Sequence, residues 1–166
     1  MRNIRFVVLA LGAIVALVAL GGCGSSKTHG EEGSVKLIEP GGNSGMVTPF
    51  GKFNGKTFTP GTGIVIANPL QNTEKKTMGE INAVCLSTQP TVKGFLLSGT
   101  CSGTATVPGG SFALNVGGKG AIGGTVSGSI TGGTGKYNGA VGNFSSKAKG
   151  GGESPMKEDT FNYILP

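Results

Sequence analysis

The chain lacks residue types on which many catalytic sites depend. Its 166 residues include no tryptophan, a single histidine and three cysteines, and charged residues make up only 13%. One histidine, His29, and eight acids leave little material for a histidine-based metal site or a Ser-His-Asp triad. We therefore expect no metal ion and no cofactor, and the sequence identifies no catalytic residue.

Arginine is confined to Arg2 and Arg5, both within the first 22 residues. The remaining chain carries 12 lysines against eight acids, and the lysines are scattered. Proteins that read nucleic acids usually rely on arginine for paired contacts with bases and phosphates. The sequence therefore predicts no nucleic-acid partner and a solvated, mildly basic surface.

Glycine is abundant, with 33 residues, about three times the usual share. It follows no strict G-X-Y period, which excludes a collagen helix. The low charge argues against a solvated disordered chain. A β structure with many bends and tight turns is the remaining explanation.

The first 22 residues have the pattern of an export signal. Arg2 and Arg5 precede an apolar run over residues 6–20, which is shorter than the roughly 20 residues of a membrane span. The run ends in Leu20-Gly21-Gly22-Cys23, which resembles the lipobox of bacterial lipoproteins. The resemblance implies lipid attachment at Cys23, with two or three acyl chains giving stable anchoring. An ordinary signal peptide or an uncleaved anchor is the alternative.

We accordingly divide the chain into a signal peptide (1–22), a flexible tether (23–33) and one domain (34–166). The tether is small and polar, which suits a spacer. The expected location is the bacterial cell envelope, on the outer side of the cytoplasmic membrane or in the outer membrane. The expected partner there is membrane lipid, through acylated Cys23.

Two cysteines remain in the predicted domain, Cys85 and Cys101. Two cysteines in an exported protein favour a disulfide, and two buried thiols are the alternative. A simple hairpin centred near Gln89 and Pro90 would not place them opposite each other. The bridge would then require a bulge or a position beside the loop.

Alternating apolar and polar residues predict strands throughout the domain, and no window shows a helical period. Gly-rich turns separate the alternating runs. The strands are expected near residues 35–39, 64–71, 79–86, 94–107, 111–117, 121–131, 137–148 and 158–165.

Eight strands joined by short connections predict an antiparallel sheet, which must close to hide its edges. The fold class is therefore all-β, a single eight-stranded antiparallel barrel. Such a barrel has room for packed side chains or for one small ligand. The barrel interior would have no space for a ligand if it were filled by five large side chains, those of Phe95, Leu97, Phe112, Phe144 and Phe161.

A glycine-rich stretch, ITGGTGKYNGAVG over residues 130–142, resembles the signature of the allene oxide cyclase and dirigent superfamily. Weaker similarity extends over about residues 62–166. The resemblance implies a calycin-type barrel that shapes an apolar cavity around a small ligand. No catalytic residue of that superfamily carries over to a position here.

The physical role expected for this stretch is a turn. Glycines 132, 133 and 135 are expected to permit positive φ between two strands, and Thr134 to hydrogen-bond the turn backbone. Tyr137 is expected to open the next strand, which bends at Gly139 and Gly142. A phosphate cradle is the alternative, but a strand follows rather than a helix.

The acids give no clear catalytic pair. Glu80 is expected to point outward, and Glu153, Glu158 and Asp159 lie at or beside a glycine loop. We therefore expect an envelope lipoprotein whose barrel binds a small apolar ligand or a partner without catalysis. The alternative is a cyclase, an isomerase or a dirigent-type guide acting on an apolar metabolite. An open cavity containing an inward charged residue would favour the alternative.

Overall fold

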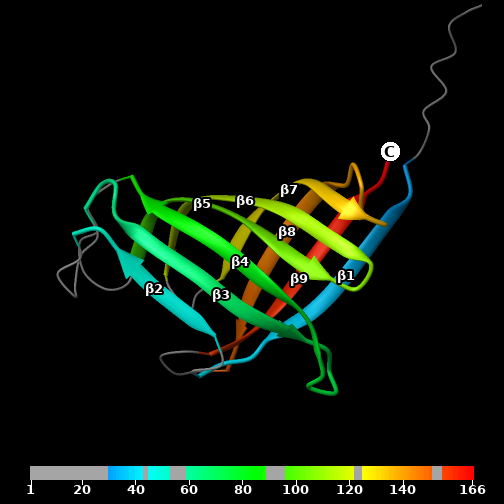
Figure 1. Ribbon diagram of the computed structural model, residues 1–166, viewed down its shortest axis with the longest axis horizontal. Coiled ribbons are helices and arrows are strands. Elements are labelled where there is room, and N and C mark those ends of the chain that lie inside the picture. The colour runs from blue at the N-terminus through cyan, green and yellow to red at the C-terminus, as the bar shows by residue number, and fades with distance from the viewer. Residues whose placement is uncertain (1–29, 43–44, 53–58, 89–95, 122–124, 151–154) are drawn as a thin grey trace, which may run out of the picture.

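A computed structural model describes residues 30–42, 45–52, 59–88, 96–121, 125–150 and 155–166, apart from the side chains of 96–98 and 119–121. The predicted signal peptide, Cys23 and His29 lie outside these residues. Nine strands are present (Figure 1): β1 (Glu32–Glu39), β2 (Met46–Phe50), β3 (Gly63–Gln71), β4 (Thr77–Ser87), β5 (Leu96–Val107), β6 (Gly110–Ala121), β7 (Val126–Gly135), β8 (Val141–Lys149) and β9 (Met156–Ile164). The described part of the chain holds no helix that could cross a membrane.

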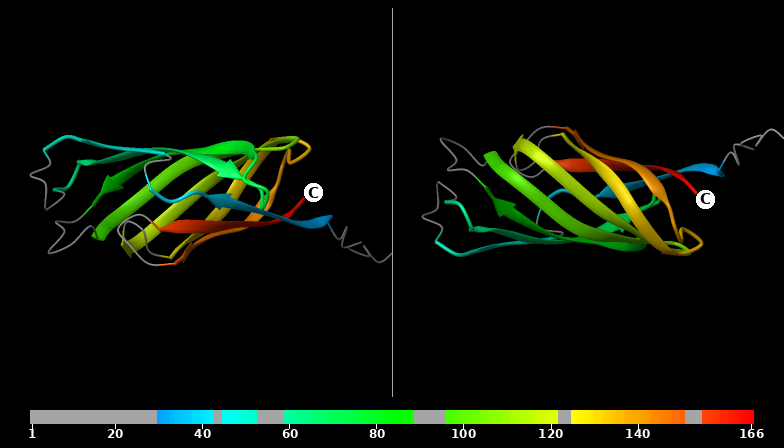
Figure 2. Two further views of the ribbon diagram at one scale, coloured as in Figure 1. Left: turned by 90° about the horizontal axis from the view of Figure 1, so that it is seen from below. Right: turned by 90° about the horizontal axis from the view of Figure 1, so that it is seen from above.

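The strands form one antiparallel sheet that closes on itself. Its order is β1-β9-β8-β7-β6-β5-β4-β3-β2, and Ile38 of β1 also pairs with Gln71 of β3. This last pairing closes an eight-stranded barrel, which Figure 2 shows from two opposite sides. The predicted all-β barrel is therefore confirmed.

Strand β2 is the ninth strand and was not predicted. It lies along the same edge of β3 as β1 and runs in the same direction. Ile38 and Met46 are eight positions apart, whereas their partners on β3, Gln71 and Ala67, are only four positions apart. The chain therefore leaves the sheet between β1 and β2 and returns to it. The five residues of β2 include a proline and have an exposed, non-alternating pattern, so periodicity could not identify them.

The predicted alternation is confirmed along the described strands. Ile81 and Cys85 of β4 are buried, whereas Glu80, Val84 and Leu86 between and beside them are exposed. The same two-residue period continues through β5, β6, β7 and β8. One face of each strand therefore lines the barrel interior.

The core is concentrated in one half of the barrel. Five aromatic rings pack there: Phe112, Tyr137, Phe144, Phe161 and Tyr163. The Phe112 ring centroid lies 4.2 Å from that of Tyr137 and 5.2 Å from that of Phe161. Of the five expected filling residues, Phe112, Phe144 and Phe161 are buried, whereas Phe95 and the side chain of Leu97 lie outside the described part.

The glycine-rich stretch forms the β7–β8 connection, although not as expected. Gly132 and Gly133 lie in β7, and neither has a positive φ. Gly133 instead allows close approach, because a Cβ there would collide with the backbone oxygen atoms of Tyr137 and Ser111. Positive φ occurs at Gly135 (61°), which directly precedes the four-residue turn over 136–139, and at Gly139 (76°), which is its last residue.

Two further expectations for this stretch are corrected. Tyr137 lies inside the turn rather than opening β8, and its buried ring packs in the aromatic half of the barrel. Its hydroxyl donates a hydrogen bond to the Pro108 backbone oxygen (3.3 Å). The Thr134 side-chain hydroxyl forms a hydrogen bond with the Ser111 hydroxyl (2.7 Å). The Thr134 backbone oxygen accepts a hydrogen bond from the backbone N–H of Tyr137. Gly142 lies within β8, where a Cβ would collide with the Asn162 backbone oxygen of β9.

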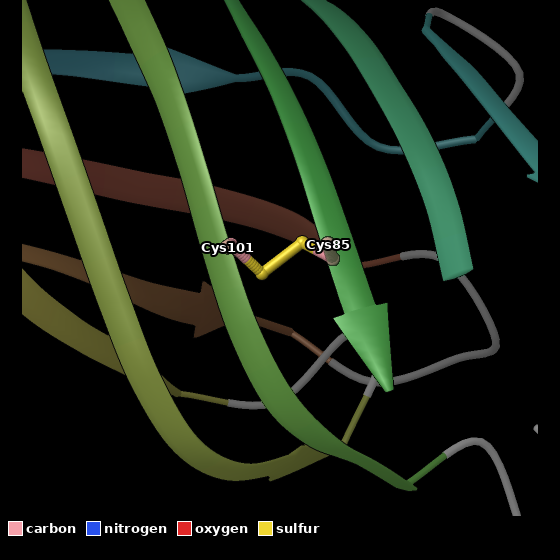
Figure 3. The surroundings of a disulfide bond; sticks show 2 residues. All are labelled: Cys85 and Cys101. Carbon is pink, nitrogen blue, oxygen red and sulfur yellow. A yellow bond between two sulfur atoms is a disulfide. The ribbon is translucent and has the colours of Figure 1, made fainter. Parts of the chain in front are cut away.

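Cys85 and Cys101 form a disulfide that joins β4 to β5 (Figure 3). The two residues are direct partners in the β4–β5 register. The expected misalignment was wrong because the β4–β5 register also pairs Ser87 with Gly99 and runs through both cysteines without a shift. No bulge is needed for the bridge.

Candidate ligand-binding cavity

The barrel interior is hollow in the half that faces β2. A cavity of about 200 Å³ lies there, lined by the end of β1, by β2, and by the nearby parts of β3 to β9. Its wall is mainly aliphatic and includes the side chains of Val47, Ile64, Ile66, Ile81, Leu114, Val116 and Val126, together with both cysteines of the disulfide. Among the described residues, Phe144 is the aromatic residue that lines the cavity, and its ring also packs against Phe161 of the aromatic half. An apolar wall of this size can enclose a small organic molecule.

One side of the cavity is polar. Glu39 at the end of β1 and Lys157 at the start of β9 are direct partners in the sheet, and both line the cavity. Lys157 Nζ donates to Glu39 Oε1 (2.8 Å), and Asn68 Nδ2 of β3 donates to the same oxygen (2.6 Å). The Glu39 and Lys157 side chains are 9% and 21% exposed, so the ion pair is only weakly screened by solvent.

Asp159 lies two residues beyond Lys157 on the inward face of β9. It is completely buried, and its partners in the sheet are Leu37 of β1 and Ser146 of β8. Neither carboxyl oxygen of Asp159 has a hydrogen-bond partner among the described residues, and the same is true of the Ser146 hydroxyl. A buried polar group without a partner costs free energy, so this arrangement is unusual for a purely structural residue.

The surroundings of Asp159 favour its neutral form. Burial raises the pKa of the Asp159 carboxyl to about 7. The nearby Ser146 hydroxyl lowers this pKa without meeting the geometry of a hydrogen bond, Glu39 raises it, and Lys157 lowers it. A carboxyl group that titrates near neutral pH inside a cavity-bearing barrel is a candidate for binding or proton transfer.

The sequence pattern did not identify this polar group. It placed Asp159 beside a glycine loop, whereas Asp159 lies inside β9 and faces inward. Extending the alternation of Phe161, Tyr163 and Leu165 backward by two residues would have identified Asp159. The same step along β1 from Leu37 reaches Glu39. Only the register of β1 with β9 could show that Glu39 and Lys157 are partners.

The other acids lie elsewhere. Glu80 is exposed on the outer face of β4, as expected, and Glu158 forms an ion pair with Lys149 (3.4 Å) outside the cavity. Glu153 is outside the described residues. Within the described ranges, no group of three or more His, Cys, Asp or Glu residues is placed to hold a metal ion.

Comparisons with solved structures support the barrel assignment. A pyocyanin demethylase matches with a TM-score of 0.60 and 18% identity, covering 78% of this chain and 99% of that protein. The pterocarpan synthase dirigent proteins GePTS1 and PsPTS1 match with TM-scores of 0.57 and 0.56, both at 17% identity. These matches cover 81% and 82% of this chain, and 86% and 97% of the dirigent proteins.

No protein-family model and no curated protein matches the chain. At identities below 20%, the structural matches define the fold alone: a dirigent-like antiparallel barrel.

Proposed function

We propose that the barrel binds a small, mainly apolar molecule in its cavity and carries it without chemical change. The observation that supports this proposal is the aliphatic cavity of about 200 Å³, with a single polar side around Glu39 and Lys157. Aliphatic walls contribute affinity through burial, whereas a few polar groups fix the orientation of a ligand.

Native mass spectrometry of the full chain purified from its host tests this proposal. We expect a copurified small molecule on the protein and its loss from Ala83→Phe, because Ala83 lines the cavity and faces inward from β4. Val84→Phe is the matched control, since Val84 is the next residue and is 45% exposed on the outer face. Equal ligand content in both variants, with both correctly folded, would contradict binding in the cavity.

A second candidate function is a cyclase, an isomerase or a stereochemical guide. The buried Asp159, whose carboxyl pKa is raised to about 7, favours it. The similar structures bear the names of a demethylase and of a synthase, which is consistent with chemistry on small molecules in barrels of this shape. Chiral chromatography of a host metabolite extract, before and after incubation with the protein, tests this candidate. A change that wild type causes and Asp159→Asn does not would support it.

We also propose that Cys23 carries the lipid anchor in the bacterial envelope. The lipobox-like residues before Cys23 support this proposal, and Cys23 precedes the first described residue by only seven positions. The start of β1 lies near the C-terminus, at the end of the barrel away from β2 (Figure 1). The cavity-bearing half is then the end of the barrel farther from the start of β1, where the tether would join. Incorporation of radiolabelled palmitate into wild type but not into Cys23→Ala is expected, and equal labelling would refute the anchor.

A further inference from the structure

The cavity side of the barrel has one more carboxyl group than it has cations to pair with. Among the described residues, Glu39 and Lys157 are the acid and the base that line the cavity, and Asp159 is a second buried acid two residues along β9 from Lys157. Lys157 and Asn68 both donate to Glu39, with distances of 2.8 and 2.6 Å. The single ammonium group is therefore already paired, and Asp159 is left without a partner.

The unpaired atoms belong to neighbouring strands, with Ser146 in the cavity wall and Asp159 buried next to it. Ser146 lines the cavity, and its hydroxyl has no partner among the described residues. Asp159 is the direct partner of Ser146 across the β8–β9 pair. On β9 it lies between Lys157, which lines the cavity, and Phe161, which belongs to the aromatic half. Two acceptor oxygens of Asp159 and one hydroxyl of Ser146 are thus without partners beside the part of the cavity wall that Ser146 forms.

We propose that the ligand is a small apolar molecule bearing one protonated amine, whose N–H groups donate to Asp159 and Ser146. This inference rests on the proposed binding function and specifies its ligand class. An ammonium group supplies both the missing donors and the missing positive charge, whereas an anionic ligand would add a third negative charge beside Glu39. A neutral alcohol would supply one donor and no charge.

The size of the cavity limits the apolar part of the ligand. A cavity of about 150 Å³ lined by aliphatic and aromatic side chains accommodates benzene. The cavity of about 200 Å³ therefore suits one ring with a short side chain. The aliphatic residues on the side opposite Glu39 and Lys157 would cover such a ring.

Binding of an amine would be linked to the ionisation of Asp159. The titratable groups that face Asp159 are Glu39 on β1 and Lys157 on its own strand, and the Ser146 hydroxyl faces it from β8. An ammonium ligand selects the charged carboxylate, so binding expels the proton that Asp159 holds below neutral pH. The affinity for an amine should therefore rise about tenfold per pH unit below about pH 7 and level off above it.

A pair of matched probes tests the inference by titration calorimetry of the full chain. The probes are 2-phenylethylamine and 2-phenylethanol, which share a ring and a two-carbon chain but differ in charge. We expect the amine to bind at least about tenfold more tightly than the alcohol above neutral pH, as for hydrogen bonds to a charged group. We expect this advantage to shrink as the pH falls to about 5.

Two variants test whether Asp159 is the residue that gives the preference for the amine. In Asp159→Asn, the affinity for the amine should fall to that for the alcohol and lose its pH dependence. Glu80→Gln is the control, because Glu80 is an exposed acid on the outer face of β4, and it should bind both probes like wild type. Thermal unfolding of each variant establishes that it is folded.

The possible failures can be told apart. Equal binding of both probes, or an amine affinity that does not change with pH, would overturn the amine inference while the binding function stands. Amine binding that survives in Asp159→Asn would overturn it as well. If neither probe binds, the amine inference is wrong. Native mass spectrometry of the copurified ligand then shows separately whether the cavity binds another class of molecule.

Discussion

Lys157 and Asp159 occupy successive inward positions of β9, yet Lys157 forms its ion pair with Glu39 on the neighbouring strand rather than with Asp159. The pairing follows from register, because Glu39 lies directly opposite Lys157, whereas Leu37 lies opposite Asp159. It leaves Asp159 buried and without a hydrogen-bond partner among the described residues, beside Ser146 of the cavity wall. This arrangement has consequences for stability as well as for binding.

The stability of the protein should depend on pH through Asp159. Its pKa of about 7 in the folded protein exceeds the ordinary value of 3.8. The folded state therefore holds a proton that the unfolded state releases, and stability should fall as the pH rises from about 4 to about 7. The loss amounts to roughly 4 kcal/mol, which Asp159→Asn should largely remove. Urea unfolding at a series of pH values measures it, and a flat wild-type profile over that range would contradict the prediction.

Tyr137 should be a major contributor to stability. Its side chain is 1% exposed and packs against Phe112 and Tyr163. Tyr137→Ala should cost about 3–5 kcal/mol, as for other large core aromatics. Tyr137→Phe should cost only about 1 kcal/mol, because it removes the hydrogen bond to the Pro108 oxygen but keeps the ring. Equilibrium urea unfolding would reveal the difference, and equal losses would argue against the packing role of the ring.

Two adjacent glycines of the β7–β8 motif should respond differently to alanine. A Cβ at Gly133 would collide with the backbone of Tyr137 and Ser111, whereas a Cβ at Gly132 would approach only the Ala113 Cβ, at 3.9 Å. We expect Gly133→Ala to cost about 2 kcal/mol or more and Gly132→Ala to stay within about 0.5 kcal/mol. Thermal unfolding of the two variants side by side is the measurement. A greater loss of stability in Gly132→Ala than in Gly133→Ala would contradict the close backbone approach at Gly133.

The disulfide should stabilise the cavity-bearing half. Cys85 and Cys101 are 16 positions apart in the sequence, and a loop of this length corresponds to about 3 kcal/mol in the chain-entropy treatment. Wild type should therefore lose about that much stability when a reductant is added during urea unfolding. The double variant Cys85→Ala/Cys101→Ala serves as the control, because its stability should not respond to reductant. A similar loss of stability in both proteins on adding reductant would mean that the disulfide is not the cause of the loss.

The sequence alone predicted most of the wall of the barrel. Eight of the nine strands were identified because alternation survives wherever one face is buried. Strand β2 was not identified from the sequence because it contains Pro49 and has no alternating burial. The glycine-rich stretch was recognised as a connection between strands, but the positions of its positive φ values were partly wrong. Gly132 and Gly133 continue β7, and glycine at 133 is required by a neighbouring backbone rather than by the turn.

Local pattern by itself determined the all-β class, the strand positions and the inward face of most strands, because alternation depends only on neighbouring residues. The tertiary structure decided which inward residues meet. The register of β1, β8 and β9 places Glu39 beside Lys157 and Asp159 beside Ser146, although the members of each pair come from distant parts of the chain. Closure through Ile38 and Gln71 brings Asn68 of β3 to Glu39. Side-chain pairing across strands depends on register and closure, so the polar side of the cavity exists only in the folded barrel.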